Sequence, residues 1–409
     1  HVVKICPSAI VCSLYVPSQS TDFTLPTSTS TLYPQNLVTL SEHFMRIVHL
    51  VGHTGLNGVA TSSVILAREQ VRAGHSVMMV VPEYSWMRWQ EIGKDVPIEL
   101  TSFKTSPKEI RRVGHAIRAW KGNVVHCHGS KANKYGMVYR LSVGAPVVMT
   151  AHTRQFQLPW PAAHVVIAPS AETADYYHRR MLARRSATRV IANMFPVDSV
   201  PVVTTESRAA ARAVLGLEQD AFVIGAVGHL EERKNQAAMH RLARRLAATG
   251  VPVRLLLIGR LLDDSSDAER HVAKELGDDP MVMLTGQRED VATVLPAFDA
   301  FLMLSSREEA PIAPLEAMAR AIPTVSYRVG NMADIAPPGL LCEQGDEEGV
   351  FQCLARLAAD ADARQKAGAS CRSMIADHLS PAAILPQIED AYREAISRSR
   401  FPDTLKPVA

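Results

Sequence analysis

Short apolar runs alternate with stretches of helical periodicity along most of the chain, and this alternation restricts the fold more than any other feature. From Met45 onward, runs such as MRIVHLV and HSVMMVVP are separated by a glycine-containing turn and a stretch with apolar residues at helical spacing. Strands that are apolar throughout and separated by helices are typical of parallel sheets with helices on both faces. The sequence therefore predicts an α/β fold.

The same alternation starts again in the second half of the chain. Residues 196–208 (PVDSVPVVTTESR) lack periodicity and are rich in Pro, Ser and Thr, which is typical of a linker. With 409 residues, the chain is also too long for one ordinary core. We therefore predict two doubly wound, Rossmann-like domains, at 45–200 and 201–380. Ligands are expected at the carboxyl ends of the strands and in the cleft between the domains.

The composition is that of a soluble globular protein, with 47% hydrophobic and 21% charged residues. No apolar run reaches the roughly 18–20 residues that a membrane-spanning helix needs. The cysteines are scattered without a C-x-x-C pair, which indicates reduced thiols and disfavours a disulfide scaffold or a zinc site. They are Cys6, Cys12, Cys127, Cys342, Cys353 and Cys371.

Residues 1–44 have a different character from the rest of the chain. They begin at His1, which is not an initiator, and combine a short apolar piece with a Ser/Thr-rich run. The apolar piece is short and almost no basic residues precede it, so a signal peptide is the weaker interpretation. We expect a disordered leader, or sequence upstream of a true start at Met45.

Charge is distributed unevenly between the two halves. Residues 45–200 contain 20 Lys and Arg against nine Asp and Glu, whereas residues 201–409 contain 23 against 30. A basic first half indicates an anionic partner. Within it, the stretch 104–121 has basic residues and an apolar stripe at helical spacing. It is either an ordinary amphipathic surface helix or a surface that docks on an anionic membrane or acceptor. No nucleic-acid partner is expected.

The stretch 306–323, SREEAPIAPLEAMARAIP, contains two carboxylates, Glu308 and Glu316, eight positions apart. It follows an apolar strand, and Pro311 and Pro314 suit the start of a helix. Solvated surface acids are the ordinary interpretation of such a pair. The amides at a helix start, however, bind anions, and flanking carboxylates can hold sugar or ribose hydroxyls. The pattern therefore favours a nucleotide-sugar site.

This segment resembles the E-x7-E signature of the group 1 family of retaining glycosyltransferases, which have the GT-B fold. Glu309 stands where glycine is common in that signature. Other segments resemble the family in the same order, over most of residues 46–345; they include NVVHCHGSK, PVVMTAHT and VGHLEERKN. The usual form is E-G-x-P-x-x-x-x-E-A-M-A, and the chain matches it at Glu308, Pro311, Glu316, Ala317, Met318 and Ala319.

The resemblance implies a role for each part of the signature. Glu308 would bind hydroxyls of the transferred sugar, and Glu316 would bind the ribose hydroxyls. The backbone around Ala310, Pro311 and Ile312 would face the sugar or its phosphate. The first domain would bind the acceptor and the second the donor, and a C-terminal helix at 381–399 would cross back to the first domain.

The resemblance also assigns the cations of the donor site. Lys234 matches the family's phosphate-binding lysine, which can meet the charge that grows on a departing nucleoside diphosphate. Next to Gly228, His229 stands where the family has an arginine, and histidine carries that charge only when protonated. Either Arg233 or Arg260 compensates, or the donor site is weaker or pH-sensitive; His229 could also be a turn residue without a role.

On the first domain, His152 ends the strand APVVMTAH and matches the family's histidine near the reacting centre; a structural role is the alternative. The loop with Gly52, Gly55 and Gly58 suits close approach of the backbone to phosphate or acceptor, but it is not the dinucleotide fingerprint.

Two features bear on metal binding. His126 and His128 alternate along a strand and are expected to point to opposite faces, with at most one in the cleft, which disfavours a shared metal. The Asp360-Ala361-Asp362 triplet is interpreted as solvated surface. No metal and no cofactor are therefore expected.

The sequence thus predicts a retaining glycosyltransferase that moves a sugar from a nucleotide-sugar to a glycan, lipid-linked or lipopolysaccharide acceptor. The alternatives are a sugar-nucleotide epimerase of the same fold and a non-catalytic nucleotide-sugar-binding protein. A phosphorylase would need a much longer chain. The expected location is the cytoplasm, or the inner face of the cell membrane through peripheral contact.

Overall fold

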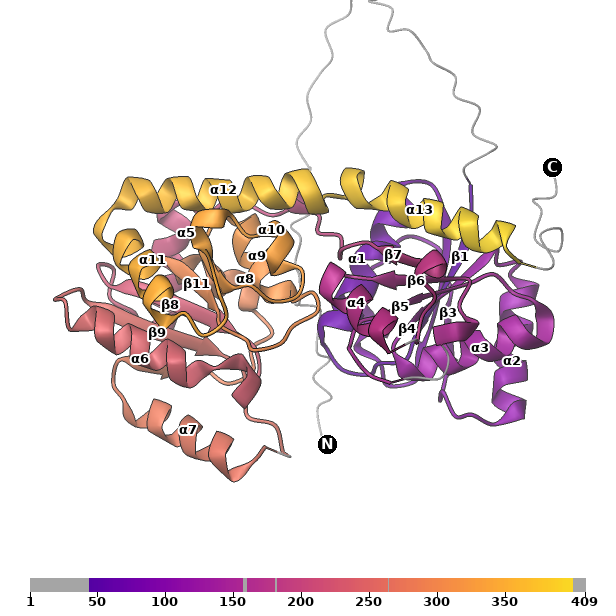
Figure 1. The fold of residues 1–409 in the computed structure, drawn as a ribbon, viewed down its shortest axis with the longest axis horizontal. Helices are drawn as coiled ribbons and strands as arrows, with labels where there is room; N and C mark the ends of the chain where they lie inside the picture. The colour runs from indigo at the N-terminus through magenta and orange to yellow at the C-terminus, as the bar shows by residue number, and fades with distance from the viewer. Residues whose placement is uncertain (1–43, 157–159, 181, 264, 400–409) are drawn as a thin grey trace, which may run out of the picture.

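The computed structural model describes residues 44–156, 160–180, 182–263 and 265–399. The predicted leader, residues 1–44, lies outside this part of the chain except for Phe44. The described residues form two parallel sheets, each in its own domain (Figure 1). The prediction of two doubly wound α/β domains is confirmed.

The first sheet has the strand order β3-β2-β1-β4-β5-β6-β7, and every neighbouring pair is parallel. Its central strands β1 and β4 are buried almost throughout, as their mostly apolar sequences indicate; His49, His126 and His128 are the buried polar exceptions. The strands are β1 (Arg46–Val51), β2 (Ser76–Pro82), β3 (Ile98–Thr101), β4 (Val124–His128), β5 (Val147–Thr150), β6 (Val165–Ala168) and β7 (Thr188–Val190).

The second sheet has the order β10-β9-β8-β11-β12-β13 and is also parallel throughout. In both sheets the order reverses beside the first strand, so a crevice opens there at the carboxyl ends of the strands. The strands are β8 (Phe222–Val227), β9 (Val253–Ile258), β10 (Val282–Leu284), β11 (Ala300–Met303), β12 (Thr324–Tyr327) and β13 (Leu341–Cys342).

Helices cover the faces of both sheets. In the first domain they are α1 (Gly58–Arg72), α2 (Pro107–Ala119), α3 (Ser130–Val143) and α4 (Ala171–Arg179). In the second they are α5 (Thr205–Leu215), α6 (Gln236–Ala247), α7 (Asp267–Asp278), α8 (Val291–Val294), α9 (Ile312–Ala319), α10 (Met332–Ile335), α11 (Glu347–Ala359) and α12 (Ala361–Leu379). None of the described helices has the length and hydropathy that a membrane crossing needs.

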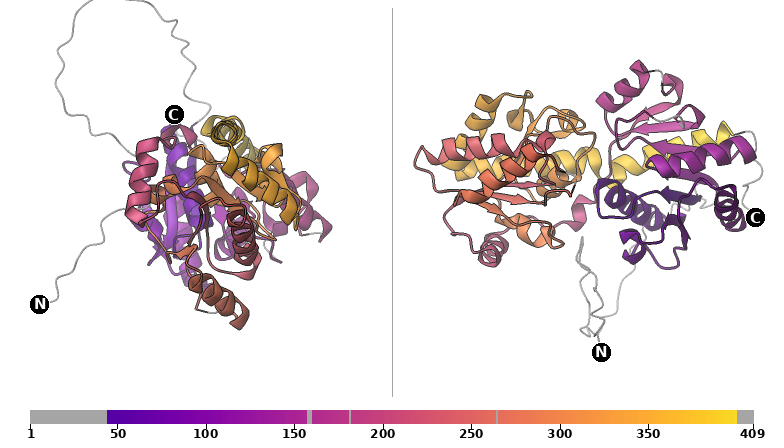
Figure 2. Two further views of the ribbon diagram at one scale, coloured as in Figure 1. Left: turned by 90° about the vertical axis from the view of Figure 1, so that its left-hand side faces the viewer. Right: turned by 90° about the horizontal axis from the view of Figure 1, so that it is seen from below.

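The last helix, α13 (Pro381–Ser397), leaves the second domain and lies along the first (Figures 1 and 2). It packs against β4, β5, β6 and α1 of the first domain. Tyr392 of α13 is completely buried there and belongs to the same apolar core as Ile47 and Val148. A proline at the first position of α13 has no amide hydrogen to satisfy, which suits the break between α12 and α13.

Helix α2 carries most of the basic stretch 104–121. Ser106 caps its start, Pro107 occupies the first turn, and Val113 and Ile117 are its buried residues. Its lysines and arginines are exposed. The structure therefore shows an amphipathic surface helix, and it does not test docking on a membrane.

Candidate active site

A cleft of about 650 Å³ lies between the two domains and is lined from both sides. The second domain contributes the loops after β8 and β11 and the start of α9. The first contributes the start of α1 and the loop after β5. Eleven of the predicted residues line this cleft. Nine are on the second domain (Gly228, His229, Arg233, Lys234, Glu308, Ala310, Pro311, Ile312 and Glu316) and two on the first (Gly58 and His152).

Glu308 lines the cleft from the second domain. It lies in the loop after β11 and is only 7% exposed. Its Oε1 accepts hydrogen bonds from Nζ of Lys234 at 2.5 Å and from Nη1 of Arg233 at 2.9 Å. Burial alone would raise the pKa of Glu308, but the charges of Lys234 and Arg233 outweigh it and lower that pKa. Glu308 is therefore ionised at neutral pH.

A single 3-10 turn, Glu232–Lys234, places both cations beside that carboxylate. The turn ends at Asn235 in the left-handed conformation, with φ of 60°, which sends the chain into α6. The backbone carbonyl of Arg233 accepts a hydrogen bond from the amide of Ser306 at 2.8 Å. The turn after β8 and the loop after β11 are thus fixed to each other, although they are distant in sequence.

The start of α9 faces the same cleft. No described side chain caps it, so its first-turn amides are open to a ligand. Glu316, one turn further on, also lines the cleft. Gly330 lies directly beneath the preceding loop, with φ of +53°, and a Cβ atom there would lie 2.6 Å from the carbonyl oxygen of Glu309. A side chain at position 330 would push this loop out of place.

His229 lines the cleft on the second domain and carries no charge at neutral pH. Burial lowers its pKa, and the neighbouring cations Arg260, Lys234 and Arg233 lower it further, although Glu231 opposes them. The positive charge of the family's arginine is therefore missing at this position. Arg233 also lines the cleft and supplies a guanidinium close by.

On the first domain, Gly58 begins α1, and a Cβ atom there would lie 3.7 Å from Cγ1 of Ile312 at the start of α9. The two helix starts thus face each other across the cleft. Asn57 caps α1 by accepting from the amide of Ala60 at 3.0 Å. Of the predicted glycine loop, Gly58 lines the cleft, whereas Gly52 and Gly55 are not among the described residues that do.

A group of ionic contacts that the sequence did not predict joins the domains at the mouth of the cleft. Arg154, two residues after His152, donates from its amide and its Nε to Oε1 of Glu309, at 3.2 and 3.1 Å. It also pairs with Glu172 of α4. Glu172 in turn accepts from the amide of Gly330 at 2.9 Å. Glu309, unusual for the resembled signature, thus has a partner in the opposite domain.

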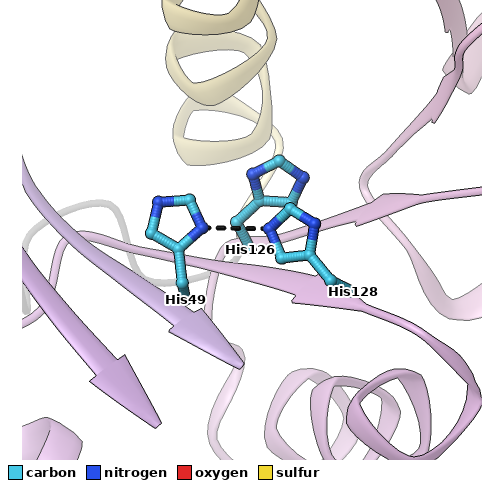
Figure 3. A group of neighbouring side chains, drawn as sticks. All are labelled: His49, His126 and His128. Atoms are coloured by element: carbon cyan, nitrogen blue, oxygen red, sulfur yellow. Dashed lines mark hydrogen bonds between the residues drawn. The ribbon is translucent and has the colours of Figure 1, made fainter. Parts of the chain in front are cut away.

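The prediction that His126 and His128 point to opposite faces of the sheet is wrong. Residues two apart on a strand point to the same face, because side chains alternate with a period of two. Their ring centroids are 4.1 Å apart, and His49 of β1 lies directly opposite His126 in the register of the sheet (Figure 3). Ring nitrogens of the three histidines lie within 4.8 Å of one another. All three rings are completely enclosed by protein.

Comparison with known proteins agrees with this geometry. The family described as "Glycosyl transferases group 1" matches residues 207–374, and the family "Glycosyltransferase Family 4" matches residues 56–199. The two matches fall on the second and the first domain respectively.

Individual relatives are distant. N-acetyl-alpha-D-glucosaminyl L-malate synthase of Bacillus anthracis is 28% identical over 36% of this chain and 39% of its own length. UDP-Gal:alpha-D-GlcNAc-diphosphoundecaprenol alpha-1,3-galactosyltransferase of Escherichia coli is 24% identical over 68% of this chain and 77% of its own. The chain thus covers well under half of the first relative.

The fold is shared with solved structures. Anabaena HepE, crystallised with UDP and glucose, superposes with a TM-score of 0.72 at 17% identity, over 85% of this chain and 99% of that one. Two doubly wound domains facing a cleft form the GT-B fold, and the family matches of both domains are to glycosyltransferases. The chain belongs to the group 1 glycosyltransferases. The family predicted from the sequence is confirmed, while the retaining mode stays a prediction.

Proposed function

We propose that this protein transfers a sugar from a nucleotide-sugar donor to a glycan or lipid-linked acceptor, with retention of the anomeric configuration. The observation that carries the proposal is the position of Glu308. A buried, ionised carboxylate bonded to Lys234 and Arg233 lies beside the uncapped start of α9. This places hydroxyl-binding and phosphate-binding groups next to each other, as a nucleotide-sugar requires.

Each group has a distinct task in the proposal. Glu308 accepts hydrogen bonds from hydroxyls of the transferred sugar, and Glu316 from those of the ribose. The bond between the anomeric carbon and the diphosphate oxygen breaks during transfer, and negative charge grows on the diphosphate. Lys234 and the amides of α9 face that charge from fixed positions, where they stabilise it more than water would. Arg233 takes over the charge that His229 lacks.

Donor binding can be tested without knowing the acceptor. We would measure thermal unfolding with UDP, GDP and ADP and with a glucose conjugate of each. Because a ligand that binds only the folded state stabilises it, one nucleotide and its sugar should raise the melting temperature. Lys234→Ala should abolish that rise, and Lys366→Ala, an exposed lysine on α12, should not. No response to any compound would reject the donor site.

The retaining mode is a proposal that rests on the resemblance of 308–316 to the family signature. Its test is the anomeric proton of the first sugar product, followed by NMR while an α-linked donor is consumed. An α product appearing first supports retention, and a β product appearing first rejects it. Nucleotide release at an undiminished rate without any acceptor, together with a change in the sugar's configuration at another carbon, would instead favour the epimerase alternative.

The acceptor is proposed to be a glycan or a lipid-linked sugar, bound by the first domain. Support comes from the Escherichia coli relative, whose name specifies a diphosphoundecaprenol acceptor. The exposed basic face of α2 would then meet an anionic membrane surface, on the cytoplasmic side. Co-sedimentation with phosphatidylglycerol vesicles tests this: Lys108→Glu with Arg111→Glu should reduce binding. Charge reversal at Arg270 and Lys274 of α7 in the second domain is the control.

A further inference from the structure

A continuous path of hydrogen bonds runs from the cleft into the core of the first domain. It begins at His152, whose Nε2 is 3.0 Å from Nδ1 of His128. Nε2 of His128 is 2.9 Å from Nδ1 of His49, the contact drawn in Figure 3. Nε2 of His49 is 2.7 Å from Oε1 of Gln70 on α1. The imidazoles of His128 and His49 thus link the cleft residue His152 to the buried amide of Gln70.

The path continues from the amide to the C-terminal helix. Nε2 of Gln70 donates to the hydroxyl of Tyr392 on α13 at 2.9 Å. That hydroxyl is 2.8 Å from Nδ1 of His126, and Nε2 of His126 is 2.7 Å from Oγ1 of Thr150. Both ring nitrogens of His49, His126 and His128 therefore have a protein partner. A metal ion among them would have to break these bonds, so we assign the cluster to hydrogen bonding.

Every imidazole on the path is held neutral. Burial lowers the pKa of His49 to about 4. Burial and the nearby His53 lower the pKa of His152 to about 3. Burial and the neighbouring histidines lower the pKa of His126 and His128 well below the usual value. A neutral imidazole has one N–H donor and one lone-pair acceptor, so each ring is either the Nδ1–H or the Nε2–H tautomer.

The orientation of the Gln70 amide determines the tautomer of every histidine on the path. Its carbonyl oxygen faces His49, so His49 must donate from Nε2 and accept at Nδ1. His128 must then donate from Nε2 and accept at Nδ1, and His152 must donate from Nε2. Nδ1 of His152, the nitrogen that the path does not use, keeps its lone pair. An amide turned the other way would invert every tautomer on the path.

We propose that Gln70, His49 and His128 are positioning residues that hold His152 in its Nε2–H tautomer, so that Nδ1 is a hydrogen-bond acceptor in the cleft. The group that meets this nitrogen must then be a donor, such as a sugar hydroxyl, and not a phosphate or carboxylate oxygen. The statement about the hydroxyl rests on the proposed function, whereas the tautomer does not. Tyr392, whose hydroxyl accepts a hydrogen bond from Gln70, connects this hydrogen-bond path to α13.

The tautomer can be measured directly in the ligand-free protein. Long-range ¹H–¹⁵N NMR of histidine-labelled protein distinguishes Nε2–H from Nδ1–H, and His152→Gln assigns the signal. We expect His152 as Nε2–H from pH 6 to 8. The Nδ1–H form, a mixture, or the imidazolium would overturn the proposal. This result does not depend on any donor being bound, so it stands or fails separately from the proposed function.

Variants at Gln70 test control from a distance. Gln70→Glu keeps an oxygen that accepts from His49, in either protonation state, and should leave His152 as Nε2–H. Gln70→Leu removes the acceptor and should give a mixture of tautomers. If His152 stays entirely Nε2–H in a folded Gln70→Leu protein, the positioning role is wrong.

A double-mutant cycle tests the link to the sugar. The ratio of UDP-glucose affinity to UDP affinity isolates contacts with the sugar. Gln70→Leu should lower that ratio by roughly threefold to tenfold, as loss of one hydrogen bond would. In a His152→Ala background it should have no further effect, because the path then ends before the cleft. An undiminished effect in that background would show that Gln70 acts through the fold and not through His152.

Discussion

The ionic contact between Arg154 and Glu309 should hold the two domains together at the mouth of the cleft. Glu309 stands where glycine is common in the family signature, and its carboxylate reaches the amide and Nε of Arg154 in the other domain. Removing the carboxylate by Glu309→Ala deletes both bonds. Arg154 keeps Glu172 as a partner, so the variant does not leave a buried charge unpaired.

The magnitude follows from how far the pair is shielded from water. The side chains of Arg154 and Glu309 are 12% and 16% exposed. Exposed pairs contribute about 0–1 kcal/mol, and breaking fully buried ones costs about 3–5 kcal/mol. We therefore expect a coupling of about 1–2 kcal/mol. That corresponds to a roughly 5- to 30-fold shift in the ratio of closed to open molecules.

Single-molecule energy transfer between dyes at positions 108 and 366, on exposed faces of α2 and α12, would measure that ratio. The set comprises the parent, Glu309→Ala, Arg154→Ala and the double variant, whose non-additivity gives the coupling. Glu343→Ala is the matched control, because Glu343 pairs with Arg328 inside the second domain. Additive effects within about 0.3 kcal/mol, or an unchanged distance distribution, would refute the prediction that the contact between Arg154 and Glu309 holds the two domains together.

Three further predictions concern single positions. His229→Arg should tighten UDP binding about fivefold to tenfold in calorimetry by restoring a charge worth about 1 kcal/mol near the phosphates; unchanged or weaker binding would contradict this. Despite its burial, the charges of Lys234 and Arg233 lower the pKa of Glu308 below its ordinary value of 4.5, so its ion pairs stabilise the fold above that pH and lose this effect as pH falls through the folded pKa. Accordingly, denaturant titrations from pH 7 to 3 should show the stability difference between the parent and Glu308→Gln shrinking with acid, and a constant difference would argue against it. Asp299→Ala should lower the free energy of unfolding by about 3–5 kcal/mol, since it leaves the buried Arg212, 2.6 Å away, without its carboxylate; a loss below about 1 kcal/mol would be inconsistent with that pair.

Apart from β3, the strands of both sheets could be predicted because their runs are mostly apolar and bounded by turns. The elements that the sequence did not predict have weaker patterns. Helix α7 buries only Ala273 and Leu276, and β3 is a half-buried edge strand of four residues. Helices α3 and α4 also follow their strands without a clear apolar stripe. Local periodicity cannot identify such elements, because tertiary packing decides them.

The candidate site could be predicted where its residues belong to one continuous segment or to a known pattern. Glu308 and Lys234 do line one cleft and do contact each other. Contacts between distant segments, such as Arg154 with Glu309, had no local signal beyond an arginine near His152. The error at His126 and His128 had another cause, since an even spacing on a strand means a shared face.

The most direct test of the donor site is calorimetric titration of UDP into the parent protein, Lys234→Ala and Lys366→Ala. Lys234 bonds the buried Glu308 in the cleft, while Lys366 is exposed on α12. We expect one UDP per chain, an affinity at least about tenfold weaker in Lys234→Ala because a charge-assisted bond is lost, and no change in Lys366→Ala. Equal affinity in all three proteins, or no binding to the parent, would contradict it.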